Sequence, residues 1–162
     1  MSRLILVLGD QLSETLSALV AGDKACDVVV MAEVRGEARY VRHHPKKIAL
    51  IFAAMRKFAT RLQTQGWAVR YTCYDDVENA GSLGGELLRR ASEGGQSAVL
   101  VTQPGEWRLI NALQDVPLHV EMLNDDRFIA SPADFETWAS GRKSLRMEYF
   151  YRDMRRRTGL LM

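Results

Sequence analysis

Two polar segments of the sequence contain residues that can bind a ligand. Gly9 and Asp10 come directly after an apolar run, Leu4–Leu8, and Glu37 comes shortly after a second run, Val28–Ala32. The carboxylates of Asp10 and Glu37 can accept hydrogen bonds from the ring or the hydroxyl groups of a heterocyclic ligand. Gly9 lets the backbone approach such a ligand closely. The residue types leave an alternative open, in which Asp10 caps the next helix and Glu37 is solvated.

Common motifs for other chemistries are absent. The sequence has no P-loop pattern GxxxxGK[ST], and no dinucleotide fingerprint GxGxxG follows the first apolar run. The segment Gly81–Gly84 has the wrong spacing for a GxSxG nucleophile elbow. His43 and His44 are adjacent, so a helix does not easily turn both toward one metal ion. Phosphate cradling, serine-hydrolase chemistry and metal binding are therefore unsupported by motifs.

Five short runs are predicted to be strands, separated by segments of helical periodicity. Leu4–Leu8, Val28–Ala32 and Ala98–Thr102 are nearly continuously apolar, as strands buried on both faces of a sheet are. Ala68–Cys73 and Leu118–Leu123 alternate, which places them nearer an edge. The order predicts an α/β fold with a five-stranded, mostly parallel sheet flanked by helices.

The polar segments must lie at one edge of this sheet. In an open parallel sheet, ligands bind beyond the carboxyl ends of the strands, where the strand order reverses, and Asp10 and Glu37 both follow predicted strands. The segment PGEWR follows the fourth strand at the same edge. There, Trp107 is predicted to be a core residue, and Glu106 and Arg108 are predicted to form a surface pair.

The longest predicted helix is Pro45–Gln65, in which apolar residues recur every three or four positions after a proline in the first turn. Gly66 is predicted to end it. The other predicted helices are Leu83–Ala91, a segment through Trp107, Ile110 and Leu113, one that Ser131 caps before Pro132, and Arg146–Arg157.

The composition indicates a globular protein. The chain has 162 residues, of which 47% are hydrophobic, enough for a core and against a disordered or disulfide-scaffold protein. Cys26 and Cys73 lack CxxC spacing, so neither a zinc site nor a redox motif is indicated. No stretch approaches the ~20 apolar residues of a membrane span, and no signal-peptide cleavage site follows the first residues. We expect a soluble, cytoplasmic protein with reduced thiols.

Positive charge gathers near the end of the sequence. Residues 142–157 include seven basic and two acidic residues, although the whole chain has a formal charge of only +2. Arg155–Arg157, with the aromatic residues Tyr149–Tyr151, can contact phosphates; an arginine-rimmed helix docked on a second domain is the other interpretation. The apolar tail Leu160–Met162 predicts either contact with a further part of the protein or a tail folded back onto its own sheet.

Five longer segments are more specific than any of these patterns. They are LVLGDQLS (6–13), EARYVRHHPKKIALIFAAMRKFA (37–59), PGEWR (104–108), DDRF (125–128) and WASGRKSLRMEYFYRDMRRRTGLLM (138–162). Together they resemble the deoxyribodipyrimidine photolyase-related proteins, the bacterial branch of the cryptochrome/photolyase family that carries an iron–sulfur cluster. The resemblance extends from Leu4 to Met162.

The resemblance implies a Rossmann-like three-layer antenna domain at residues 1–141 and a basic connecting helix at 142–162. In the family, the chain continues into a domain that holds FAD, a [4Fe–4S] cluster and the DNA-lesion pocket, and that repairs a photolesion or signals in blue light. The expected partner is therefore the FAD domain of the same full-length chain, with DNA reached through the full-length protein. The segment itself is expected to be inactive alone.

The resemblance also implies an antenna pocket for 6,7-dimethyl-8-ribityllumazine at the carboxyl edge of the sheet. The residues that would hold its ring and ribityl groups are Gly9, Asp10, Gln11, Glu33 and Glu37, and those that would cover it are Ile48, Ile51 and Phe52. One departure is Ala32, where many relatives have cysteine; the shorter side chain is expected to alter the affinity.

Two other functions stay open. A stand-alone Rossmann-like nucleotide-binding protein would be stabilised by ATP or AMP, although the missing glycine fingerprints count against it. A purely structural domain with an empty cavity would bind no chromophore.

Overall fold

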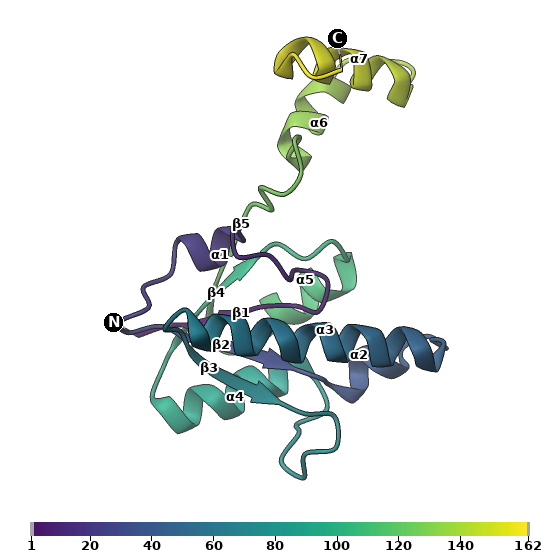
Figure 1. Ribbon diagram of the computed structural model, residues 1–162. Coiled ribbons are helices and arrows are strands. Elements are labelled where there is room, and N and C mark those ends of the chain that lie inside the picture. The colour runs from purple at the N-terminus through teal and green to yellow at the C-terminus, as the bar shows by residue number, and fades with distance from the viewer. Residues whose placement is uncertain (1, 162) are drawn as a thin grey trace. The chain divides into compact units, whose positions relative to one another are not determined.

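The computed structural model describes residues 2–161, and the chain divides into two compact units, Met1–Asn124 (unit 1) and Asp125–Met162 (unit 2). The elements of unit 1 are β1 (Leu4–Leu6), α1 (Ser17–Val20), β2 (Val28–Ala32), α2 (Arg35–Arg39), α3 (Pro45–Thr64), β3 (Ala68–Thr72), α4 (Leu83–Gly94), β4 (Ala98–Thr102), α5 (Trp107–Gln114) and β5 (His119–Leu123) (Figure 1). Unit 2 contains α6 (Pro132–Ala139) and α7 (Met147–Thr158).

The strands of unit 1 form one parallel sheet in the order β3-β2-β1-β4-β5. Leu4 of β1 pairs with Val28 on one side and with Val99 on the other, so the strand order reverses at β1. The predicted α/β fold is confirmed, and the sheet is parallel throughout. The two strands with alternating sequences, β3 and β5, are its edges, as expected.

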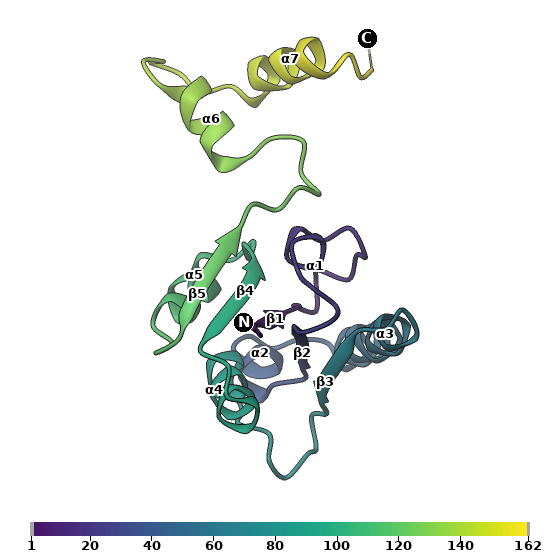
Figure 2. The same ribbon diagram turned by 90° about the vertical axis from the view of Figure 1, so that its left-hand side faces the viewer.

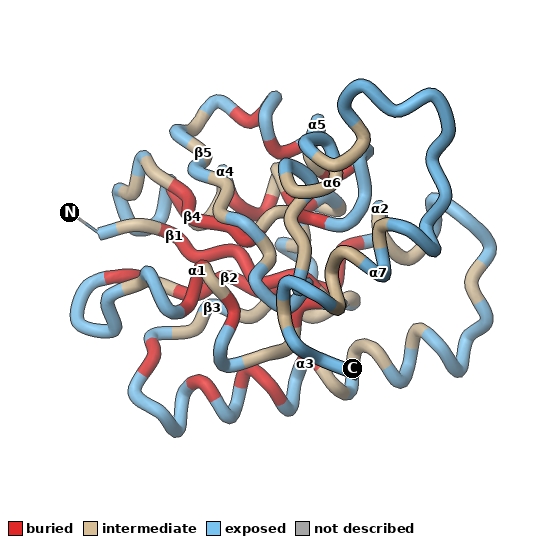
Figure 3. The backbone as a smooth tube through the Cα atoms, turned by 90° about the horizontal axis from the view of Figure 1, so that it is seen from above, coloured by how far each residue is buried: buried red, intermediate tan, exposed pale blue. Residues whose placement is uncertain are grey.

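Helices cover both faces of the sheet, which gives unit 1 three layers (Figure 2). Leu4 and Leu6 of β1 pack in a core cluster with side chains of α4 and α5, whereas Ile5 packs in a second cluster with α1 and α3. Because successive side chains of a strand point to opposite faces, burial on both faces explains why the central strands are continuously apolar. Buried residues are concentrated in these strands (Figure 3).

The long helices agree closely with the predicted ones. His44 caps α3 by accepting a hydrogen bond at Nδ1 from the Lys46 amide at 3.2 Å, and Gly66 follows the helix with a φ of 90°, a conformation that favours glycine. α4 continues beyond the predicted Ala91 to Gly94. α1 and α2 were not predicted, because helices of four and five residues are too short to show a helical period.

The prediction that Trp107 is a core residue is wrong, since its exposed fraction is 73%. α5 instead buries Leu109 and Leu113 against the sheet. Residues four positions apart share a helix face, whereas Trp107 stands two positions before Leu109 and therefore lies on the opposite side.

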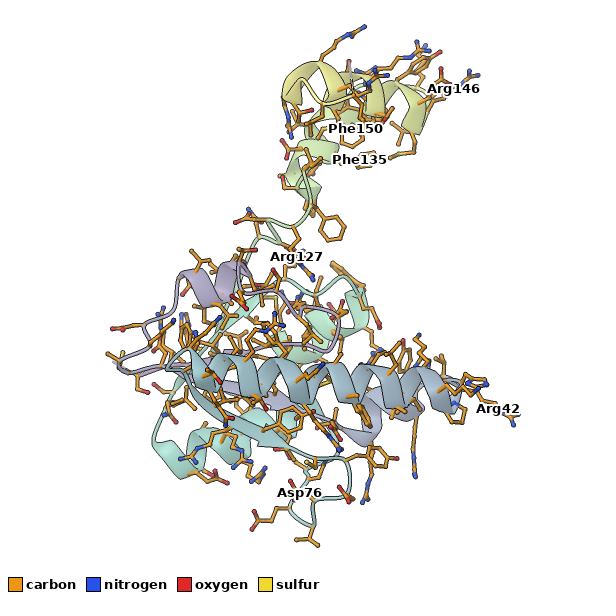
Figure 4. All side chains as sticks on the ribbon, in the orientation of Figure 1. Arg42, Asp76, Arg127, Phe135, Arg146 and Phe150 are labelled. Atoms are coloured by element: carbon orange, nitrogen blue, oxygen red, sulfur yellow. The ribbon has the colours of Figure 1, made fainter. Side chains whose placement is uncertain are left out.

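Unit 2 is a helical pair with its own aromatic cluster. Ser131 caps α6 as predicted, in a capping box with Asp134. The ring centroid of Phe150 on α7 lies 5.3 Å from that of Phe135 and 5.1 Å from that of Trp138, both on α6. Figure 4 labels Phe135 and Phe150 in these two helices. The two compact units divide after Asn124, so α6 and α7 belong to the same unit. The assignment of 1–141 as an antenna domain stays a prediction.

The end of the chain is exposed where it is described. Leu160 and Leu161 are exposed by 53% and 74%, and Met162 lies outside the described residues. Within the described residues 2–161, no helix is both long enough and apolar enough to cross a membrane.

Candidate functional site

A cavity of about 280 Å³ lies at the carboxyl edge of the sheet of unit 1. It is lined by residues that end or follow β1, β2 and β4, by α3 residues between Lys47 and Met55, and by Leu83 at the start of α4. The strand order reverses at β1, and open α/β sheets bind ligands beyond the carboxyl ends of the strands at such a reversal. The location predicted from Asp10 and Glu37 thus coincides with a cavity.

Most of the cavity lining is apolar. The apolar lining residues are Val7, Leu8, Ala32, Val34, Ala38, Ile48, Ile51, Phe52, Met55, Leu83 and Leu109. On α3 the spacing of Ile48, Ile51, Phe52 and Met55 places them on one face of the helix. The three residues predicted to cover the ligand therefore all line the cavity.

Polar groups join this apolar lining from three segments. Asp10, Glu37 and Glu106 contribute carboxylates, and Tyr40, His43 and Lys47 complete the polar lining. Tyr40, His43 and Lys47 were not assigned from the sequence, although they lie within the segment 37–59 that supports the resemblance. Ala32, the position of the departure from cysteine, also lines the cavity, so its side chain affects the wall directly.

The alternative role of Asp10 is not seen, because the residue that precedes α1 is Leu16, so Asp10 does not cap that helix. Glu37 is partly solvated, with 32% of its side chain exposed, and it is also paired: Nη1 and Nη2 of Arg108 donate to its two oxygens at 2.9 Å and 2.8 Å. Arg108 also pairs with Glu106 at 3.0 Å, as predicted, but its pairing with Glu37 was not foreseen.

Gln11 and Glu33 do not line the cavity, and their assignment as ligand contacts stays a prediction. Gln11 is fully buried, and its side-chain Nε2 donates to the carbonyl oxygens of Thr102 at 3.0 Å and Gln103 at 3.3 Å. Glu33 stands between Ala32 and Val34, which both line the cavity; in extended backbone, it points the other way.

Glu33 instead accepts hydrogen bonds from residues of α3, of β3 and of the loop after β3. Its carboxylate accepts hydrogen bonds from Nε of Arg56 at 2.5 Å, the Tyr71 hydroxyl at 2.6 Å and the Tyr74 amide at 2.9 Å. Burial opposes ionisation of Glu33, but these hydrogen bonds and the Arg56 charge outweigh it and hold its pKa below the usual value. Burial and the hydrogen bond to Glu33 raise the pKa of Tyr71.

We expect unit 1 to lose stability in acid. Three buried carboxylates, Asp27, Glu33 and Glu86, have lowered pKa values because their hydrogen bonds outweigh the cost of burial. Below about pH 5 the unfolded chain therefore binds more protons than the folded chain, and the free energy of unfolding falls as the pH decreases. Urea unfolding followed by circular dichroism between pH 7 and pH 3 measures this.

The control for the acid prediction is the variant Glu33→Gln, which removes one of the three carboxylates. Its free energy of unfolding should start lower at pH 7 and fall less steeply with acid. A wild-type stability that stays constant to pH 3 would contradict the prediction.

The comparison with protein families shows the family to which the chain belongs. Residues 5–162 match the family model described as deoxyribodipyrimidine photo-lyase-related protein. The chain belongs to this family. It is also 51% identical over 166 residues to a "(6-4) photolyase" of Agrobacterium fabrum, an alignment that covers 100% of this chain and 33% of that protein. The predicted family is confirmed, and the chain spans about a third of the length of this photolyase-related relative.

Proposed function

We propose that unit 1 is the antenna-binding module of a photolyase/cryptochrome-like flavoprotein and that its cavity binds 6,7-dimethyl-8-ribityllumazine. The observation that carries the proposal is the composition of the cavity: an apolar wall from α3 and the strand ends, joined by the carboxylates of Asp10 and Glu37. A ligand with a planar ring and a hydroxylated chain matches both parts, because the ring needs apolar contact and hydroxyls need acceptors.

The size of the cavity also favours this ligand over a dinucleotide. At about 280 Å³, the cavity is near the small end of ligand pockets, which span roughly 300–1,000 Å³. A single bicyclic ring system is therefore the better fit.

The lining residues that the sequence analysis singled out have the following roles in this proposal. Ile48, Ile51 and Phe52 contact the ring and exclude water from it. Asp10 and Glu37 accept hydrogen bonds from donors on the ring or the ribityl chain, and Gly9 allows the backbone to approach. When bound, the lumazine absorbs light and transfers excitation energy to a flavin.

We propose that the flavin is bound in a full-length protein of which this chain is one part. There, an FAD domain of the same chain is the partner of unit 1 and acts on DNA photolesions or in blue-light signalling in the cytoplasm. A [4Fe–4S] cluster does not fit this chain, since such clusters are held by about four cysteines and the chain has two. Within residues 2–161, no group of His, Cys, Asp and Glu is arranged to hold a metal ion.

Lumazine titration of the purified chain, followed by absorption and fluorescence, tests the proposal. Saturable binding is expected, and Asp10→Ala with Glu37→Ala should weaken it by at least about tenfold because two hydrogen-bond acceptors are lost. The matched control is Asp126→Ala with Glu136→Ala, which removes two exposed carboxylates of unit 2. A chain that binds AMP or ATP but not lumazine would overturn the proposal in favour of a nucleotide-binding protein.

A further inference from the structure

Arg108 contacts three residues of the cavity lining although it does not line the cavity itself. Its guanidinium binds both carboxylate oxygens of Glu37, at 2.9 Å and 2.8 Å, and one of Glu106 at 3.0 Å. The carbon at its centre also lies 4.2 Å from the ring centroid of Tyr40. One exposed side chain therefore connects lining residues from two distant parts of unit 1.

These contacts matter because α2 has little else to hold it. No residue of α2 is buried, so core packing does not fix the helix. Among the described residues 2–161, the other hydrogen bonds from α2 to neighbouring loops run from the Gly36 amide to the Gly81 carbonyl at 2.8 Å and from Nε of Arg39 to the Tyr74 hydroxyl at 3.2 Å. Neither attachment involves a side chain of the cavity lining.

The network extends beyond α2 to the segment that leads into α3. The Tyr40 hydroxyl donates to Glu106 at 3.3 Å, and the edge-to-face contact between Tyr40 and His43 has a centroid distance of 5.4 Å. Tyr40 therefore contacts both Arg108 and His43. Through Tyr40, Arg108 restrains a second stretch of the cavity wall.

We propose that Arg108 is the positioning residue of the cavity: it fixes α2 on the start of α5 and holds Glu37 and Tyr40 in place for the ligand. The ligand part of this inference rests on the proposed function. A guanidinium binds a carboxylate with two parallel hydrogen bonds, which sets its orientation; a lysine ammonium binds as a point charge and does not. The hydrogen bond with Glu37 raises the pKa of Arg108, so its charge is constant at physiological pH.

Hydrogen exchange of the ligand-free chain tests the positioning role directly. In Arg108→Gln, the amides of residues 35–43 should exchange several-fold faster, whereas those of the central strands should be unchanged. The control is Arg61→Gln, which removes another exposed arginine–glutamate pair, with Glu14 at 3.3 Å, outside the cavity. Exchange at residues 35–43 equal to that of the wild type would overturn the proposal.

Lumazine titration supplies the second readout. Arg108→Gln should weaken binding by about tenfold, as expected for a lost charge-assisted partner of a ligand-binding group, and Arg108→Lys should lie between it and the wild type. At saturation, the fluorescence anisotropy of the bound lumazine should also fall. Unchanged affinity and anisotropy would overturn the role at the ligand, while a wild-type chain that binds no lumazine would refute the proposed function and leave hydrogen exchange to decide about Arg108.

Discussion

Replacing Glu33 with leucine is expected to lower the free energy of unfolding of unit 1 by about 3 kcal/mol, the size expected when buried polar groups lose a charged partner. The Glu33 carboxylate is fully buried. Its removal leaves the Tyr71 hydroxyl and the Tyr74 amide without an acceptor. The side chain of Arg56 is 54% exposed, so its guanidinium can regain water, which keeps the loss below that of a fully buried pair.

Urea unfolding measures the effect of Glu33→Leu, with Glu14→Leu as the control. Glu14 pairs with Arg61 at 3.3 Å, and both side chains are largely exposed, so its replacement should change the free energy of unfolding by less than about 1 kcal/mol. Under conditions in which the Glu33 variant is folded, it should still bind lumazine. Wild-type stability combined with lost binding would instead support Glu33 as a ligand contact.

The variant Ala38→Trp is expected to weaken lumazine binding by at least about 100-fold, which corresponds to ~2.7 kcal/mol. Ala38 lines the cavity from α2 and is half-buried, so an indole at this position occupies space that the ligand needs. Because α2 buries none of its residues, the larger side chain does not have to enter the core. The free energy of unfolding should therefore change little.

Absorption and fluorescence titration of lumazine measures the loss, with Ala49→Trp as the matched control. Ala49 is exposed on α3 and does not line the cavity, so this variant adds the same indole to the helix that forms the wall. Tight binding by Ala38→Trp would show that the ligand is held elsewhere. Weak binding by both variants would show that the loss does not depend on filling the cavity.

Local sequence patterns predict the five strands, the longer helices and the α/β class. Alternation in β3 and β5 and continuous apolar runs in β1, β2 and β4 followed from burial on one or both faces of the sheet. The period of α3 placed Ile48, Ile51 and Phe52 on one face. These features depend on groups a few positions apart, whose relative direction is set by strand or helix geometry. The cavity edge was predictable for the same reason, because parallel strands end together.

Which faces of the elements meet depends on long-range packing. In extended backbone, the side chain of Glu33 points away from those of Ala32 and Val34. The packing of α3 and α4 on the sheet determines which of these two directions faces the cavity. Likewise, both Trp107 and Leu109 are suitable core residues, and the position of α5 on the sheet buried only Leu109. Arg108 and Glu37 are 71 residues apart, and their pairing exists because the strand order carries the β4–α5 connection to the edge where β2 ends. Short-range patterns contain no information on such pairs.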